Sequence, residues 1–118
     1  MKLTVKEQER LIMFNVAEVS RWRWKRGVKL NYIEAMSIIC DELLERAREG
    51  KDSIYDLVEL GSRIITEEDV MEGTPEMLPV IQLEVMFPDG NKLVSVQEPI
   101  RLEKREDAVP VSELVSMD

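Results

Sequence analysis

The chain has 118 residues, of which 44% are hydrophobic and 34% charged, and its formal net charge is −8. This balance predicts one soluble domain and argues against general attraction to nucleic acid or anionic lipid. The chain has 0 histidines, which excludes an imidazole base and a histidine-ligated metal within it.

The compartment is predicted from cysteine usage and from the apolar runs. Cys40 is the only cysteine, so an internal disulfide is excluded and a reducing compartment is favoured. No apolar run is long enough to cross a bilayer, and the first residues lack the apolar core of a secretory signal. We therefore expect a cytoplasmic protein that does not enter a membrane.

The first predicted helix starts at a capping box and ends near residue 26. Thr4 is followed three residues later by Glu7, and Gly27 stands at the expected end. Its apolar residues recur at helical spacing, so we expect them to face the core: Leu11, Ile12, Val16 and Val19, with Phe14, Ala17 and Trp22 broadening the stripe.

The second predicted helix follows Asn31 and ends at Gly50. One face is apolar: Ile33, Met36, Ile39, Cys40, Leu43, Leu44 and Ala47. The other face is charged, and we expect it to lie in water: Glu34, Asp41, Glu42, Glu45, Arg46, Arg48 and Glu49. Cys40 lies in the apolar stripe and is expected to be a buried, unreactive thiol.

Two shorter helical segments are predicted next. Ser53 can cap a helix over residues 54–60 that Gly61 closes. Thr66 can start a further turn of helix, which the glycine and proline of residues 73–75 would stop.

A β-hairpin is predicted over residues 80–98, with strands at 80–87 and 92–98. A two-residue turn at Asp89 and Gly90 would place Phe87 opposite Lys92. One face would then hold Ile81, Leu83, Val85, Phe87, Val94 and Val96. The alternative is a type I turn followed by a glycine bulge, which Pro88 favours because it lacks an N–H for the ladder.

The fold class expected from these elements is α+β, with a small bundle of about four helices followed by an antiparallel β-hairpin. Residues 101–118 show little periodicity. We interpret them as a loosely ordered or partner-bound extension, although residues 109–115 could add an edge strand.

Two segments have residue types that can carry chemistry. Residues 21–26 read RWRWKR, which suits stacking on single-stranded nucleic acid, a protein interface anchored by Trp and Arg, or an ordinary helix end. Glu67, Glu68, Asp69 and Glu72 could bind a hard cation, but their spacing is not that of an EF-hand, and acids are ordinary in a first helical turn.

Several blocks of the sequence resemble the urease gamma subunit family. They are the opening MKLT, residues 26–35 (RGVKLNYIEA), residues 69–77 (DVMEGTPEM), residues 87–96 (FPDGNKLVSV) and the Pro99-Ile100 pair. The resemblance covers residues 1–100 in one continuous order. It suggests that residues 1–100 form a urease gamma-like domain and that residues 101–118 are an extension to it.

The resemblance implies a non-catalytic structural subunit of urease, the nickel-dependent enzyme that hydrolyses urea to ammonia and carbamate. It implies no catalytic residue and no cofactor in this chain, nickel in a partner alpha subunit, and trimers of heterotrimers with alpha and beta subunits. We expect eight apolar or aromatic residues to lie at subunit interfaces: Met1, Leu3, Trp22, Trp24, Tyr32, Met71, Phe87 and Leu93.

The chain also departs from the family pattern. Trp22 and Trp24 stand where the family is usually basic and aliphatic, Gln97-Glu98 stands where many relatives carry a histidine before Pro-Ile, and residues 101–118 extend past the usual end. These departures support an alternative, a stand-alone adaptor or regulatory protein that keeps the gamma fold. A nucleic-acid binder acting through residues 21–26 is a third hypothesis.

Overall fold

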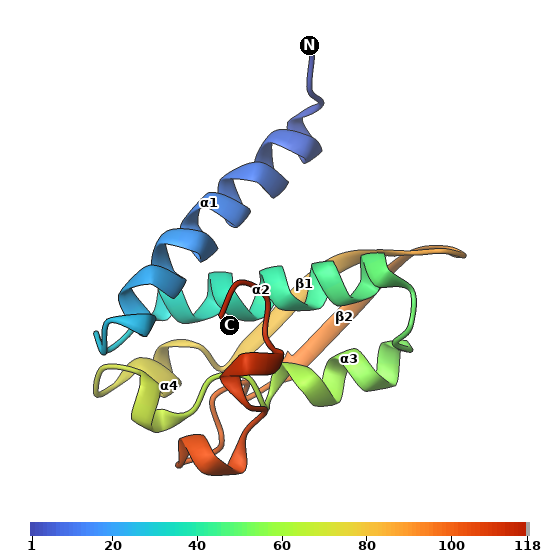
Figure 1. The fold of residues 1–118 in the computed structure, drawn as a ribbon. Helices are drawn as coiled ribbons and strands as arrows, with labels where there is room; N and C mark the ends of the chain where they lie inside the picture. Colours follow the sequence, from blue (N-terminus) through green and yellow to red (C-terminus); the bar gives the residue numbers. More distant parts are fainter. Residues whose placement is uncertain (118) are drawn as a thin grey trace.

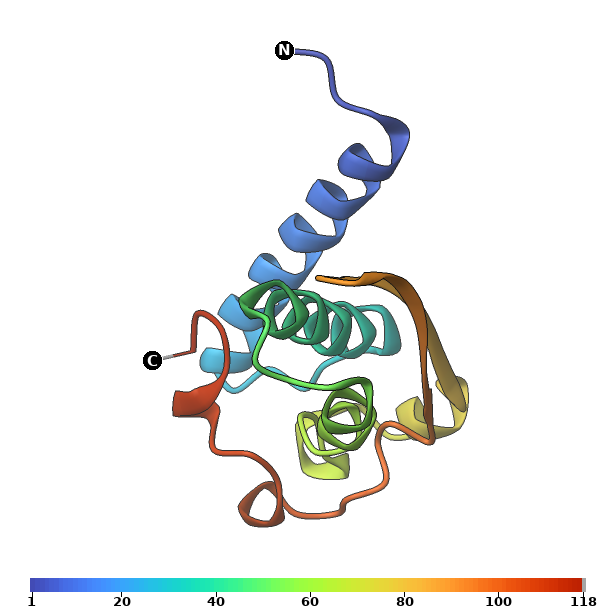
Figure 2. The same cartoon turned by 90° about the vertical axis from the view of Figure 1, so that its right-hand side faces the viewer.

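The computed structural model describes residues 1–117 and has the expected α+β class. The elements are α1 (Val5–Lys25), α2 (Tyr32–Glu49), α3 (Ile54–Gly61), α4 (Thr74–Met77), β1 (Val80–Phe87) and β2 (Gly90–Gln97). Helix α2 lies at the centre, where it contacts α1, α3, α4 and β1. The hairpin runs along α2 and α3, and the N-terminal half of α1 extends away from the rest (Figures 1 and 2).

Three of the four predicted helix starts are confirmed by their capping geometry. The Glu7 N–H donates to Thr4 Oγ1 over 3.1 Å, and the Thr4 N–H donates back to Glu7 Oε1 over 2.9 Å. The same reciprocal pair forms at Asn31 with Glu34 and at Ser53 with Asp56. Each box satisfies N–H groups that the first helical turn leaves without a backbone partner.

The segment after α3 differs from the prediction. Residues Glu67–Asp69 form a 3-10 turn, but the chain then begins α4 at Thr74, where we expected a helix to stop. Gly73 precedes α4 with φ 86°, a conformation that glycine adopts without steric cost. Pro75 lies in the first turn of α4, where its missing N–H removes no helical hydrogen bond.

Gly61 is the last residue of α3 and makes a close contact with β2, so it does not stand beyond the helix end as predicted. A Cβ at this position would lie 2.7 Å from Cγ2 of Val96, which is fully buried. The glycine therefore lets α3 approach the hairpin.

Replacing Gly61 by alanine is expected to lower the free energy of unfolding by about 1–3 kcal/mol, because the added methyl overpacks the α3–β2 contact. Urea denaturation would measure the change. In the double variant G61A/V96A the loss of unfolding free energy should be smaller than the sum of the losses in the two single variants, because the smaller residue 96 leaves room for the added methyl. A Gly61→Ala variant as stable as the parent would contradict this packing role.

The hairpin has the predicted faces but a different register. Phe87 pairs with Gly90 and Leu83 with Val94, so the predicted pairing of Phe87 with Lys92 is wrong by two residues. The turn residues are Pro88 and Asp89, and Gly90 follows with φ 125°. A shift by two preserves side-chain alternation, which is why the predicted apolar face still lies against the helices.

The hydrophobic core is formed mainly by α2, α3, the inner face of the hairpin and the loops between them. The linker before α2 joins this core through a short parallel bridge. The Leu30 N–H donates to the Asp69 carbonyl over 2.9 Å, and the Met71 N–H donates to the Leu30 carbonyl over 2.9 Å. Two segments far apart in the sequence are thereby held side by side.

Residues 101–117 form two 3-10 turns, Arg105–Asp107 and Val111–Glu113, and no edge strand at residues 109–115. Ala108 and Leu114 are buried against the rest of the chain. The division of the chain into a domain and an extension at residue 100 stays a prediction. Within residues 1–117 no helix has the length and hydropathy needed to span a membrane.

Candidate protein interface

The outer side of α1 carries exposed apolar residues. Val5, Ile12 and Val19 are 71%, 62% and 38% exposed and follow at seven-residue intervals, so they share one side of the helix. We call these three residues the outer row. Leu11, Phe14 and Trp22 are also exposed. The prediction that the apolar stripe of α1 faces the core is therefore wrong for most of its members.

The side of α1 that packs on α2 is small and polar instead. Ala17, Ser20 and Arg21 are its buried residues. The Ser20 hydroxyl donates to the Val16 carbonyl over 2.6 Å and lies 3.5 Å from the Ser37 hydroxyl of α2. Small side chains allow the two helices to approach closely, which leaves the large apolar residues of α1 on the outside.

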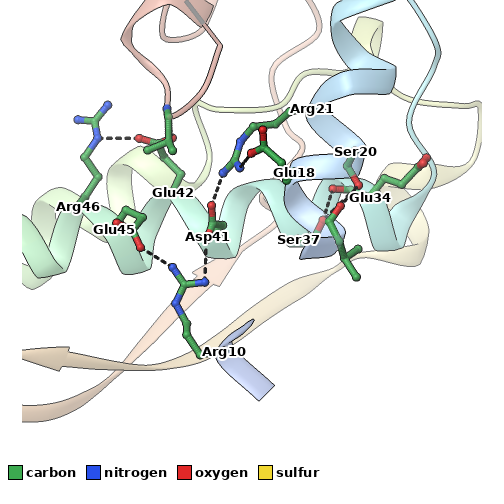
Figure 3. Close-up of polar contacts among 12 residues, drawn as sticks. Arg10, Glu18, Ser20, Arg21, Glu34, Ser37, Asp41, Glu42, Glu45 and Arg46 are labelled. Carbon is green, nitrogen blue, oxygen red and sulfur yellow. Dashed lines mark hydrogen bonds and ion pairs between the residues drawn. The ribbon is translucent and has the colours of Figure 1, made fainter. Parts of the chain in front are cut away.

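A buried carboxylate on α2 joins the two helices (Figure 3). Asp41 is fully buried and forms ion pairs with Arg21, itself buried, and with Arg10 Nη1, which lies 2.7 Å from Asp41 Oδ1. The Arg10 contact is an ion pair without the alignment of a hydrogen bond. The guanidinium groups also reach Glu18 over 3.1 Å and Glu45 over 2.7 Å.

The neighbouring carboxylate, Glu42, is buried by the C-terminal segment. It accepts hydrogen bonds from Arg46 Nε and from the Val115 N–H, both over 2.8 Å. Burial alone would lower the pKa of Arg46, but its hydrogen bond to Glu42 and the charge of Glu42 raise it above the ordinary value. The prediction that the charged face of α2 lies in water is thus wrong for Glu34, Asp41 and Glu42, which are buried.

An open groove of about 640 Å³ lies between the start of α1, α2 and the hairpin. Lys6 Nζ and Glu84 Oε1 form an ion pair across it over 2.7 Å. Its apolar lining comes from Leu3, Leu11, Met13, Leu44, Leu83 and Met86. The groove continues the apolar surface of α1 onto the outer face of the hairpin.

The eight predicted interface residues fall into three groups in the structure. Met1, Trp22, Tyr32, Met71 and Leu93 are exposed. Leu3 and Trp24 are partly buried. Phe87 is 6% exposed and belongs to the core of this chain, so it offers little surface to a partner. Contact of any of the eight with another chain stays a prediction.

Sequence reasoning did not place Val5 and Ile12 on the outside. The seven-residue spacing of Val5, Ile12 and Val19, opposite the small residues Ala17 and Ser20, was the signal that could have found them.

Three residues of the basic and aromatic segment 21–26 are engaged within the chain. Arg21 pairs with Asp41, and Arg23 Nη1 lies 2.6 Å from Glu34 Oε2. The Trp24 indole N–H donates to Asp69 Oδ1 over 3.1 Å. Trp22 remains exposed. These pairings favour an interface residue at Trp22 over a stacking surface for nucleic acid.

The carboxylates considered for a cation are not gathered into a ligand set. Asp69 accepts hydrogen bonds from the Thr66 N–H and hydroxyl, both over 2.8 Å, and from Trp24. Within residues 1–117 no group of three or more His, Cys, Asp or Glu side chains is placed to hold a metal ion.

Cys40 is buried, and this burial, together with the charge of Asp41, raises the pKa of its thiol from 9.0 to about 12. Because the folded state holds the thiol proton more tightly than the unfolded state does, the protonated thiol stabilises the fold at pH values below about 9. This stability is lost as pH rises from about 9 to about 12. We expect the parent to lose about 1.4 kcal/mol relative to C40A between about pH 8 and about pH 10. Urea denaturation at both pH values tests this, and parallel pH profiles would contradict it.

The structure is that of a small α+β domain with exposed apolar residues along α1. The chain matches the family described as "Urease, gamma subunit" over residues 1–100. It is 49% identical to the urease subunit gamma of Natronomonas pharaonis over 106 residues, which cover 90% of this chain and 96% of that one. It is 50% identical to the urease subunit gamma/beta of Pseudomonas syringae pv. syringae over 101 residues, 86% of this chain and 43% of that longer protein. The chain belongs to the urease gamma subunit family.

Proposed function

We propose that this chain works in the assembly of a nickel-dependent urease that hydrolyses urea to ammonia and carbamate. The observation that carries the proposal is the family match over residues 1–100. The exposed apolar residues of α1 supply surface for a partner. The chain has 0 histidines and so offers no imidazole ligand, and we propose that a partner alpha subunit holds the nickel, as the family resemblance implies.

The proposed partners are urease alpha and beta subunits in trimers of heterotrimers, in the cytoplasm. The relative from Pseudomonas syringae pv. syringae is named as gamma and beta together, which supports a beta neighbour for this chain. Trp22 and the outer row are the surfaces that we assign to these contacts. Large apolar and aromatic residues are enriched at such interfaces.

The proposal is tested on a tagged copy of the chain purified gently from the organism that encodes it. The eluate is assayed for urea hydrolysis and nickel, and the complex is weighed by native mass spectrometry. We expect larger chains to co-elute with nickel-dependent activity, while the isolated chain is inactive. A chain that elutes alone, or with proteins unrelated to urease, would overturn the proposal and favour an adaptor that keeps the fold.

A further inference from the structure

A single arginine beyond the family match joins three segments of the chain. Arg105 Nη1 donates to the Ile64 carbonyl over 2.6 Å and to Asp69 Oδ2 over 2.9 Å, and Nη2 donates to the Val109 carbonyl over 2.6 Å. The guanidinium also lies over the Trp24 ring, 5.4 Å from its centroid. Charge-assisted bonds of this kind are stronger than neutral ones, and the planar group orients all of them together.

Asp69 connects Arg105 to the C-terminal end of α1. One carboxylate oxygen accepts from Arg105 and the other from the Trp24 indole N–H, at 2.9 and 3.1 Å. Trp24 belongs to the last turn of α1. The C-terminal segment therefore contacts α1 directly at the face of the Trp24 indole and is linked to it a second time through the Asp69 carboxylate.

The segment is attached again farther along, on α2. Leu114 is buried, the Val115 N–H donates to Glu42, and Arg46 Nη2 donates to the Glu113 carbonyl over 3.1 Å. Between the two anchors the Val109 N–H donates to the Arg63 carbonyl over 2.9 Å. Figure 2 shows this segment wrapping the side of α2 and α3 that lies away from the hairpin.

We propose that residues 105–117 form a clasp that holds the C-terminal end of α1 against the 64–69 loop. Arg105 is the anchor on Trp24 and Asp69, and Leu114 is the anchor on α2. When the clasp is released, Trp24 becomes exposed and the last turn of α1 loosens, so the C-terminal segment controls how firmly this end of α1 is positioned. The clasp is a property of the chain itself and does not rest on the proposed urease role.

The test uses the full chain carrying Trp22→Phe, so that Trp24 is the only indole. Arg105→Met keeps an unbranched apolar stem and removes the guanidinium group with its charge. We expect Trp24 emission to shift to the red, acrylamide quenching to rise at least about threefold, and amide exchange in residues 20–26 and 108–115 to accelerate at least about tenfold. The matched control, Arg101→Met, removes a charge from the C-terminal segment at a position before the clasp. It should change neither of the two reporters, Trp24 fluorescence and amide exchange.

Faster exchange confined to residues 108–115, with unchanged Trp24 emission and quenching, would overturn the link to α1, and no change in either reporter would overturn the clasp. Should Arg105→Met unfold the chain by circular dichroism, Leu114→Ala tests the second anchor. In that variant Trp24 emission should also shift to the red and its acrylamide quenching should rise. Unchanged emission and quenching of Trp24 would count against the clasp.

Discussion

Replacing Asp41 by alanine is expected to lower the free energy of unfolding by about 3–5 kcal/mol, because it removes the buried carboxylate partner of Arg21 and leaves this buried cation only the partly exposed Glu18. Asp41 and Arg21 are both fully buried, and Arg10 shares the same carboxylate. Domains of this size have a total stability of about 5–15 kcal/mol, so the loss would remove a large part of it. Urea denaturation with a helical signal measures the change.

Two further variants separate an unpaired charge from lost packing. Glu45→Ala removes the outer, half-exposed partner of Arg10 and should cost less than about 1 kcal/mol. The triple variant D41L/R10M/R21M removes every charge of the buried cluster and should be far closer to the parent than D41A, since apolar replacement of a whole buried pair is often neutral. A cost below about 1 kcal/mol for D41A would show that water reaches this site.

The second large effect is expected at the outer row. Ile12→Glu should weaken assembly with urease alpha and beta chains at least about thirtyfold, equivalent to about 2 kcal/mol, because it places a charge within an apolar contact. The isolated chain should change in stability by no more than about 0.5 kcal/mol, because Ile12 is 62% exposed. Titration of the purified chain into the partner chains, followed by native mass spectrometry, measures the affinity.

Gln82→Glu is the matched control, because it adds the same charge at an exposed position of β1, outside the outer row, and removes no apolar side chain. It should assemble within about threefold of the parent, an energy change below about 1 kcal/mol. Equal weakening by both variants would indicate a general charge effect, and unchanged assembly of Ile12→Glu would place the partner elsewhere on the chain.

Both effects depend on how α1 is attached to the rest of the chain. Its buried residues are Ala17, Ser20 and Arg21, and its large apolar residues Met13 and Trp24 are only partly buried against the core. Buried ion pairs fix relative position because they tolerate little displacement once desolvated. Because α1 turns its polar side toward α2, Ile12 and Val19 lie on the outside. The orientation of this one helix therefore explains both its polar attachment and its exposed apolar side.

Features that arise from neighbours in the chain could be predicted from the amino-acid sequence alone. Thr4 with Glu7, Asn31 with Glu34, and Ser53 with Asp56 define helix starts, because each capping box closes over three residues. The alternation of Ile81, Leu83 and Val85 defined the inner face of the hairpin, because strand side chains repeat every second residue. The family resemblance depended on contiguous blocks and was confirmed over residues 1–100.

Which charged and apolar residues are buried became clear only from the packing of distant segments. Asp41 is covered by Arg21, twenty positions away, and Glu42 by Val115, seventy-three positions away. The periodicity of a single helix shows that it has two faces, but a face is buried only when another segment lies on it. In α1 the polar side, with Arg21, is buried within the chain, whereas most of the apolar stripe is exposed. Burial of Arg21 is possible because Asp41, a carboxylate brought close only by the fold, offsets its cost.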